Sequence, residues 1–207
     1  MGWISVTDGR VDKLNGDEFE GSFQIGLVDF TAVEANPDCW AYLNGRLVWS
    51  PRPSAYHSWN GTAWAEDAGK LAEARSVVWE RIKEYRSYRV GLGIQAGGHW
   101  FHSDLFSLMQ HIGRKDDARD VLAAGGTMSD QLTVTIPGVG TIPVLWSTMS
   151  GAQVIVTCQL AFDIIAADKM MQGLCYNVAK NHKTAMMASA DPWGYDFTTG
   201  WPAGYGE

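Results

Sequence analysis

The sequence contains few cysteines and few charged residues. Its three cysteines, Cys39, Cys158 and Cys175, are widely spaced, with no C-x-x-C pair and no histidine at zinc-ligand spacing. We expect ordinary reduced thiols buried in the fold. Charged residues make up 19% of the chain and hydrophobic residues 46%. This balance predicts a folded protein, because a disordered chain has more charge and less apolar material to bury.

Segments that direct a chain to a membrane or to nucleic acid are also missing. A membrane span needs about eighteen consecutive apolar residues, and no such run occurs. The first residues show neither the basic region nor the apolar stretch of a cleaved signal. The formal net charge is -7, with no dense Lys/Arg cluster to neutralise phosphates. We therefore expect a protein made in the cytoplasm, with no membrane insertion and no nucleic-acid partner.

Tryptophan, in contrast, is abundant, with ten residues in the chain. Its side chain offers a large contact area at a small cost in conformational entropy, and it is enriched at protein interfaces. This composition favours a protein that binds or assembles.

Residues 1–65 consist of short apolar runs separated by turn signals. Asn-Gly dipeptides at 15–16, 44–45 and 60–61 suit the positive φ angles of two-residue hairpin turns. They predict a small β-rich N-terminal attachment module, with hairpins over residues 40–49 and 56–64. The role of residues 1–35 stays open.

The remainder, residues 66–207, predicts a second domain with helices and short antiparallel strands. Apolar residues at helical spacing indicate a helix over residues 66–89. The expected elements that follow are a hairpin turning at Gly97-Gly98, a helix capped by Ser103 or Asp104 and ending near 124, two short strands around Pro137-Gly138, and a long helix over 151–189. The predicted fold class is α+β.

The expected long helix carries apolar residues at alternating spacings of three and four, which is the pattern of a short heptad seam. The expected members of this seam are Leu160, Ile164, Met171, Leu174 and Val178. The pattern fits packing within one chain or joining of copies.

Several motifs from residue 66 onward occur in the order found in a known family. They are Ala74-Arg75, residues 79–83, the hairpin with Ser103-Asp104, residues 146–149, Ala190-Asp191-Pro192, residues 195–197 and residues 199–202. This part of the chain resembles a domain of unknown function common in phage tail proteins, often C-terminal in fibre and tail-assembly proteins. Residues 51–64 resemble the short aromatic module that precedes such domains in tail fibre assembly proteins.

The resemblance implies a structural component of a bacteriophage tail, located in the virion and part of or attached to a fibre or the baseplate. Its partners would be other tail proteins, with the host surface as a further candidate. Because tail fibres are generally trimeric, a homotrimer is the preferred assembly. The alternatives are a chaperone that binds the fibre tip during assembly and, less favoured, a protein that binds or depolymerises host glycans. The family has no established catalytic residues.

Aromatic residues are the candidate binding residues. They are Tyr56, Trp59 and Trp64 in the predicted hairpin, and Trp193 and Trp201 near the end of the sequence. These rings would dock on a fibre or stack on a sugar. The structural alternatives are cross-strand pairing in the hairpin and folding of the tail back onto the long helix.

The sequence offers only weak signals for a metal site or a catalytic site. His99, His102 and Asp104 have residue types that ligate metals, but Gly97-Gly98 favours a hairpin and Asp104 suits a helix cap. Acidic pairs such as Asp116-Asp117 fit a solvated helix face better than a pair of carboxylates in a glycosidase cleft. We expect no enzymatic activity, no cofactor and no metal.

Overall fold

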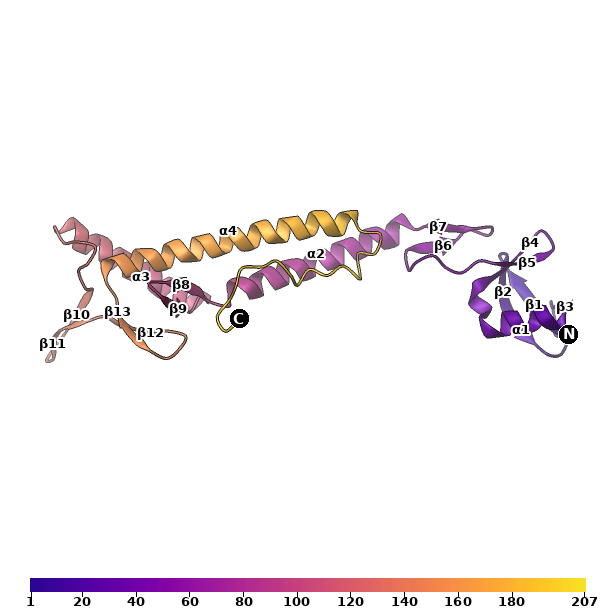
Figure 1. Cartoon of the computed structure of the whole chain (residues 1–207), viewed down its shortest axis with the longest axis horizontal. Helices are drawn as coiled ribbons and strands as arrows, with labels where there is room; N and C mark the ends of the chain where they lie inside the picture. The colour runs from indigo at the N-terminus through magenta and orange to yellow at the C-terminus, as the bar shows by residue number, and fades with distance from the viewer. The chain divides into compact units, whose positions relative to one another are not determined.

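The computed structural model describes residues 1–207, apart from the side chains of residues 27 and 28, and has an α+β fold (Figure 1). The chain divides into two compact units, residues 1–74 (unit 1) and residues 75–207 (unit 2). The boundary expected near residue 65 precedes helix α2, Ala68–Val90, whereas this division falls inside the helix. The first turns of α2 belong to unit 1 because Leu71 and Ala74 pack against Tyr56.

Unit 1 is built around a five-stranded antiparallel sheet with the order β3-β1-β2-β4-β5. Its strands are β1 (Gly2–Thr7), β2 (Arg10–Asn15), β3 (Phe23–Ile25), β4 (Trp40–Leu43) and β5 (Arg46–Trp49). The sequence did not predict helix α1, Leu27–Ala35, or the 3-10 helix Pro37–Cys39. Val33 of α1 packs on Ile4 and Ile25 and completes the core.

The turns of this sheet confirm one expectation and correct another. Asn44-Gly45 joins β4 to β5 with φ angles of 50° and 78°, and Trp40 pairs with Trp49 as expected. Asn15-Gly16 does not form a hairpin turn. The turn between β1 and β2 is Asp8-Gly9, with φ angles of 49° and 78°, because Asp-Gly accepts the same left-handed conformation.

The second predicted hairpin of unit 1 forms with a different turn. Strands β6 (His57–Trp59) and β7 (Trp64–Glu66) pair so that Trp59 lies opposite Trp64. The connection is therefore the four-residue loop 60–63, and the two-residue turn expected at Asn60-Gly61 is wrong. The Asn60 side-chain oxygen accepts hydrogen bonds from the backbone N–H groups of Thr62 and Ala63 at 3.0 and 2.9 Å, which stabilises the longer loop.

Unit 2 contains two further helices and three hairpins. Its elements after α2 are β8 (Ile94–Ala96), β9 (His99–Phe101), α3 (Leu105–Ala123), β10 (Thr133–Ile136), β11 (Gly140–Pro143), β12 (Leu145–Ser147), β13 (Gln153–Ile155) and α4 (Cys158–Ala188). The turn at Gly97-Gly98 is confirmed, and so is the cap of α3, where the Asp104 carboxylate accepts from the Ser107 N–H at 3.0 Å.

Helix α4 is the predicted long helix, but it begins later than residue 151. Residues 153–155 form β13, and the Thr157 hydroxyl accepts from the Leu160 N–H at 3.1 Å as the N-cap. The two β-branched residues Val154 and Ile155 favour a strand there, and threonine supplies the cap. The expected helix over 151–189 is thus corrected to Cys158–Ala188.

The buried face of α4 organises the core of unit 2. Ile164, Met171 and Cys175 pack on Ile94 and Phe101 of the β8–β9 hairpin. Other residues of α4 join two further clusters, one with Ala118, Leu132, Val144 and Val156, and one with Val78, Ile82 and Phe197. Among the described residues no helix is long and apolar enough to span a membrane.

Candidate interaction surfaces

The aromatic hairpin β6–β7 is held to the sheet of unit 1 by its own side chains. The rings of Trp59 and Trp64 meet edge to face, with centroids 5.6 Å apart. The Trp59 indole N–H donates to the Asp8 carbonyl at 2.5 Å, and that of Trp64 to the Ser50 carbonyl at 2.9 Å. Both indole N–H groups therefore serve internal contacts.

Arg10 fixes the two tryptophans further. Its guanidinium carbon lies 5.0 Å from the ring centroid of Trp59 and 4.9 Å from that of Trp64, within cation–π range. The same guanidinium donates to the carbonyl oxygens of Ser50 and Asp38. Sequence spacing gave no sign of this residue, because Arg10 lies on a strand far from the hairpin in sequence.

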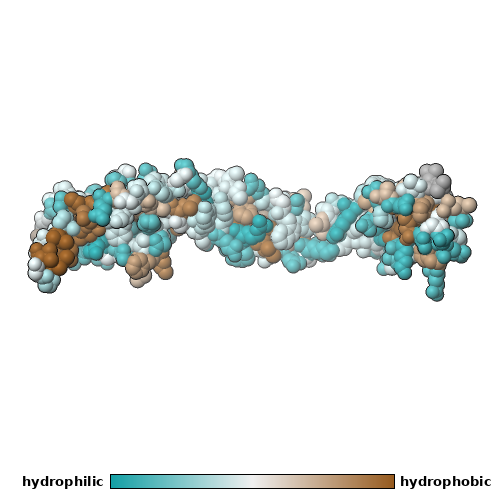
Figure 2. Space-filling view, turned by 90° about the horizontal axis from the view of Figure 1, so that it is seen from below, coloured by the Kyte–Doolittle hydropathy of each residue, from teal (hydrophilic) through white to brown (hydrophobic). Residues whose placement is uncertain are grey.

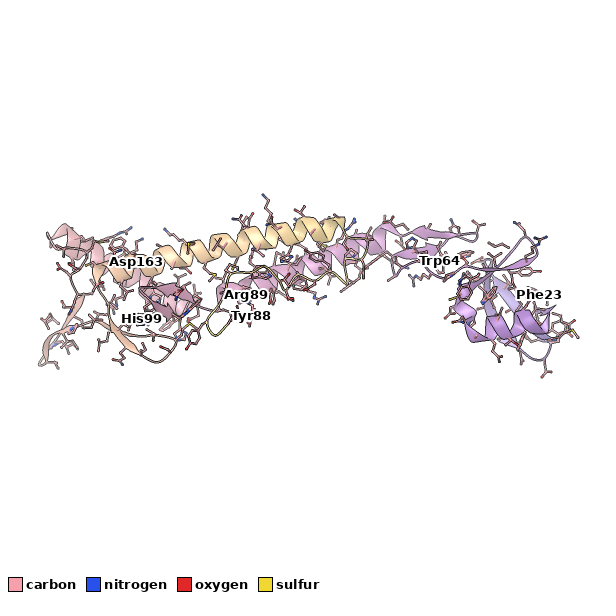
Figure 3. The ribbon with its side chains drawn as sticks, viewed as in Figure 1. Phe23, Trp64, Tyr88, Arg89, His99 and Asp163 are labelled. Carbon is pink, nitrogen blue, oxygen red and sulfur yellow. The ribbon has the colours of Figure 1, made fainter. Side chains whose placement is uncertain are left out.

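The third aromatic of the predicted binding group is separated from the other two. Tyr56 is only 4% exposed and packs with Leu71 and Ala74, whereas Trp59 and Trp64 are half-buried. The structure thus places Tyr56 in a core, and it brings Trp59 and Trp64 together as cross-strand partners. Figure 3 labels Trp64 in this hairpin.

The C-terminal aromatics fold back along the helices of unit 2, as the structural alternative anticipated (Figure 1). The His182 ring stacks on Trp201 with centroids 5.6 Å apart, and its two nitrogens contact the Tyr195 hydroxyl and the Thr199 carbonyl at 2.8 and 2.9 Å. The Trp201 indole N–H donates to the Phe197 carbonyl at 2.7 Å. Trp201 is therefore part of the packing, whereas Trp193 is 48% exposed.

The five residues of the predicted oligomer seam do not share one environment. Ile164 and Met171 are buried in the core of unit 2, and Leu160 is half-buried against it. Val178 is half-buried, and Leu174 is 46% exposed. The seam therefore packs largely within the chain, and Leu174 is its most exposed member.

A different helix exposes a larger set of apolar side chains. Leu105, Phe106, Met109 and Ile112 of α3 are 75%, 71%, 64% and 46% exposed. The spacing of Leu105, Met109 and Ile112 places them on one side of the helix, and we call these four residues the α3 apolar face. The spacing is present in the sequence, but an apolar stripe on a helix ordinarily packs into the core.

The β10–β11 hairpin also exposes apolar residues on one side. Val134 pairs with Ile142, and together with Ile136 they form one face, while the Thr135 and Thr141 hydroxyls meet at 2.9 Å on the other. All eight strand residues are exposed. Figure 2 shows hydrophobic residues gathered at the end of unit 2 that carries this hairpin. Two-stranded hairpins without cover are marginally stable in water, so this one is suited to packing against another chain.

The candidate metal residues do not form a site. His99 lies in β9, His102 is exposed, and Asp104 caps α3. Within the described part of the chain, no three His, Cys, Asp or Glu side chains are grouped to hold a metal ion.

His111 and Asp168 are buried in unit 2. Burial lowers the pKa of His111, which packs between Phe101 and Trp146. Burial raises the pKa of Asp168, one of whose oxygens accepts from the Gln172 amide at 2.7 Å. No sequence pattern indicates the burial of either residue, because burial depends on how α3 and α4 pack.

The geometry thus provides apolar and aromatic contact surfaces. Comparison with family models, curated proteins and solved structures found no match for this chain.

Proposed function

We propose that this chain is a structural component of a bacteriophage tail, part of or attached to a tail fibre or the baseplate, that acts through protein–protein contacts. The observation that carries the proposal is the α3 apolar face. Monomeric soluble proteins rarely expose several neighbouring large apolar residues, and such patches mark interaction sites. The resemblance of the motif order to that of phage tail proteins supports a tail as the assembly.

The β10–β11 hairpin supports the same proposal. Its face of Val134, Ile136 and Ile142 is exposed on a ribbon with little packing of its own. Burial of apolar area stabilises by about 25 cal/mol per Å². Contact with a partner would therefore stabilise both the ribbon and the assembly.

We propose a homo-oligomer, with a trimer preferred, located in the virion tail. Ile164 and Met171 already lie in the core of unit 2. Copies would therefore join through exposed residues, namely Leu174 and the α3 apolar face. Other tail proteins are the proposed partners, and a host surface is the further candidate.

Proteomics of purified particles of the phage that encodes this chain tests the proposal. A structural component is expected in stoichiometric amounts alongside the fibre and baseplate proteins. Absence from particles, combined with binding to a fibre protein in infected-cell extracts, would instead identify an assembly chaperone. Absence from particles together with no binding to a fibre protein in extracts would contradict a role in the tail.

A further inference from the structure

A groove runs between α2 and α4 on one side of the helix pair. Its two adjoining parts have volumes of about 610 and about 290 Å³ and share Arg86 and Tyr176. Val90 and Gln172 line one end, and Trp79 and Lys183 line the other, so the helices pass each other in antiparallel directions. The tail packs on the same two helices. Its Phe197 and Trp201 contact Tyr85, which does not line the groove. Phe197 also shares a core cluster with Trp79 and Ala179, which do line it.

Four cationic side chains line this groove: Arg86, Lys169, Lys180 and Lys183. None forms an ion pair with any described carboxylate, whereas Lys70, Lys83, Arg89, Arg114 and Arg119 all do. The whole chain carries a formal net charge of -7. Clustered unpaired cations on an otherwise acidic chain create a local positive potential that attracts an anionic partner.

Gly173 lines the groove and lies in the interior of α4. A glycine there destabilises a helix relative to alanine, so a packing reason is expected. No described residue supplies one, because a Cβ at Gly173 would meet no atom within 4 Å. The open space is therefore suited to close approach by the backbone of another molecule.

The groove fits a helix better than a sugar chain. Its α4 residues at positions 169, 173, 176, 180 and 183 are spaced by three or four, which gives one helical stripe about 21 Å long. The ring of Trp79 already has the Lys183 ammonium 4.7 Å and the Lys83 ammonium 5.8 Å from its centroid. These ammonium groups lie over the indole ring on which a sugar ring would stack.

We propose that the α2–α4 groove is a docking site for an acidic helix of a partner polypeptide. Carboxylates on one stripe of that helix pair with Arg86, Lys169, Lys180 and Lys183, and its backbone passes over Gly173. The site uses none of the residues that carry the proposed function, so either proposal can fail without the other.

Fluorescence anisotropy with the full chain and a labelled peptide tests the site. The probe is a helical Ala/Glu peptide of about 20 residues, about 30 Å long, with glutamates on one stripe. The control peptide has the same length and the same glutamates, with one central alanine replaced by proline, which breaks the helix. We expect saturable binding of the first peptide, at least about tenfold weaker binding of the second, and weakening of both as salt rises from about 0.05 to about 0.3 M.

Variants assign the binding to the groove. Lys169→Gln with Lys180→Gln should weaken binding at least about tenfold, whereas Lys115→Gln on α3 should leave it unchanged. Gly173→Ala should weaken binding while raising the midpoint of thermal unfolding, a combination that separates contact from misfolding. The proposal is overturned by no binding of the helical peptide, by equal binding of both peptides, by tighter binding of heparin than of the peptide, or by a lysine double variant that binds as the wild type does.

Discussion

Arg89 and Glu207 form a bidentate ion pair that holds the C-terminal tail on α2. Two guanidinium nitrogens of Arg89 donate to the two carboxylate oxygens of Glu207, each at 2.5 Å. The Arg89 side chain is buried, and it also donates to the Pro202 carbonyl. Figure 3 labels Arg89 on α2. A buried guanidinium needs such partners, since an unpaired buried charge is costly.

Glu207→Gln should destabilise unit 2 and flatten the acid side of its pH profile. The hydrogen bonds from Arg89 hold the pKa of Glu207 below its usual value. A depressed carboxyl pKa contributes stability above the unfolded-state pKa, near 4.5, and this contribution is lost as pH falls through the folded-state value. Urea unfolding at pH values from roughly 3 to 7 measures the difference in stability between the wild type and the variant across this titration. Equal wild-type and variant stabilities at neutral pH would contradict the role of the pair.

Arg10→Lys should loosen the β6–β7 hairpin on the sheet of unit 1. Lysine keeps the charge but cannot donate to the Ser50 and Asp38 carbonyls while lying against two indoles, so we expect a loss of about 1–2 kcal/mol. Near-ultraviolet circular dichroism reports the tryptophan environment, and denaturant unfolding reports the stability. Arg46→Lys, at an exposed position on β5, is the matched control and should change neither. Unaltered spectra and stability for Arg10→Lys would show that the guanidinium is dispensable.

Asp168→Asn should stabilise unit 2 at neutral pH by about 1 kcal/mol, because a buried ionised carboxylate is replaced by a neutral group. The pKa of Asp168 is raised in the fold, so the native state binds more protons than the unfolded state above about pH 3.8. The free energy of unfolding of the wild type therefore falls as pH rises from about 3.8 through the folded-state pKa. The gain should therefore shrink on acidification. Asp163→Asn is the control, since Asp163 also accepts from a glutamine four residues away but is partly exposed. A gain as large for Asp163→Asn would refute burial as the cause.

Local signals predicted those elements whose cause lies within a few residues. Asn44-Gly45 set the β4–β5 turn, Gly97-Gly98 set the β8–β9 turn, and Asp104 capped α3. Errors arose where two local signals competed. Ser150 and Gly151 resembled a helix start, but Thr157 is the cap because the intervening β-branched residues pair in a strand. Likewise the Asn60 side chain stabilises a four-residue loop where Asn-Gly alone predicts a tight turn.

The candidate surfaces were harder to predict, because exposure depends on how elements pack. The spacing of Leu105, Met109 and Ile112 fits a buried stripe equally well, and only packing shows that it faces outward. Arg10 meets Trp59 and Trp64 from a distant strand. The α2–α4 groove joins cations from two helices that the sequence keeps far apart.

Self-association through the α3 apolar face is the most direct test of the central claim. Native mass spectrometry of the purified chain should show a multiple of 22.7 kDa, with a trimer preferred. Phe106→Glu with Met109→Glu should shift it to single chains, because burying two carboxylates in an apolar contact is costly, while Val77→Glu on α2 should leave the assembly intact. Single chains for the wild type, together with no tail protein retained by it, would contradict the claim that this chain works by joining protein to protein.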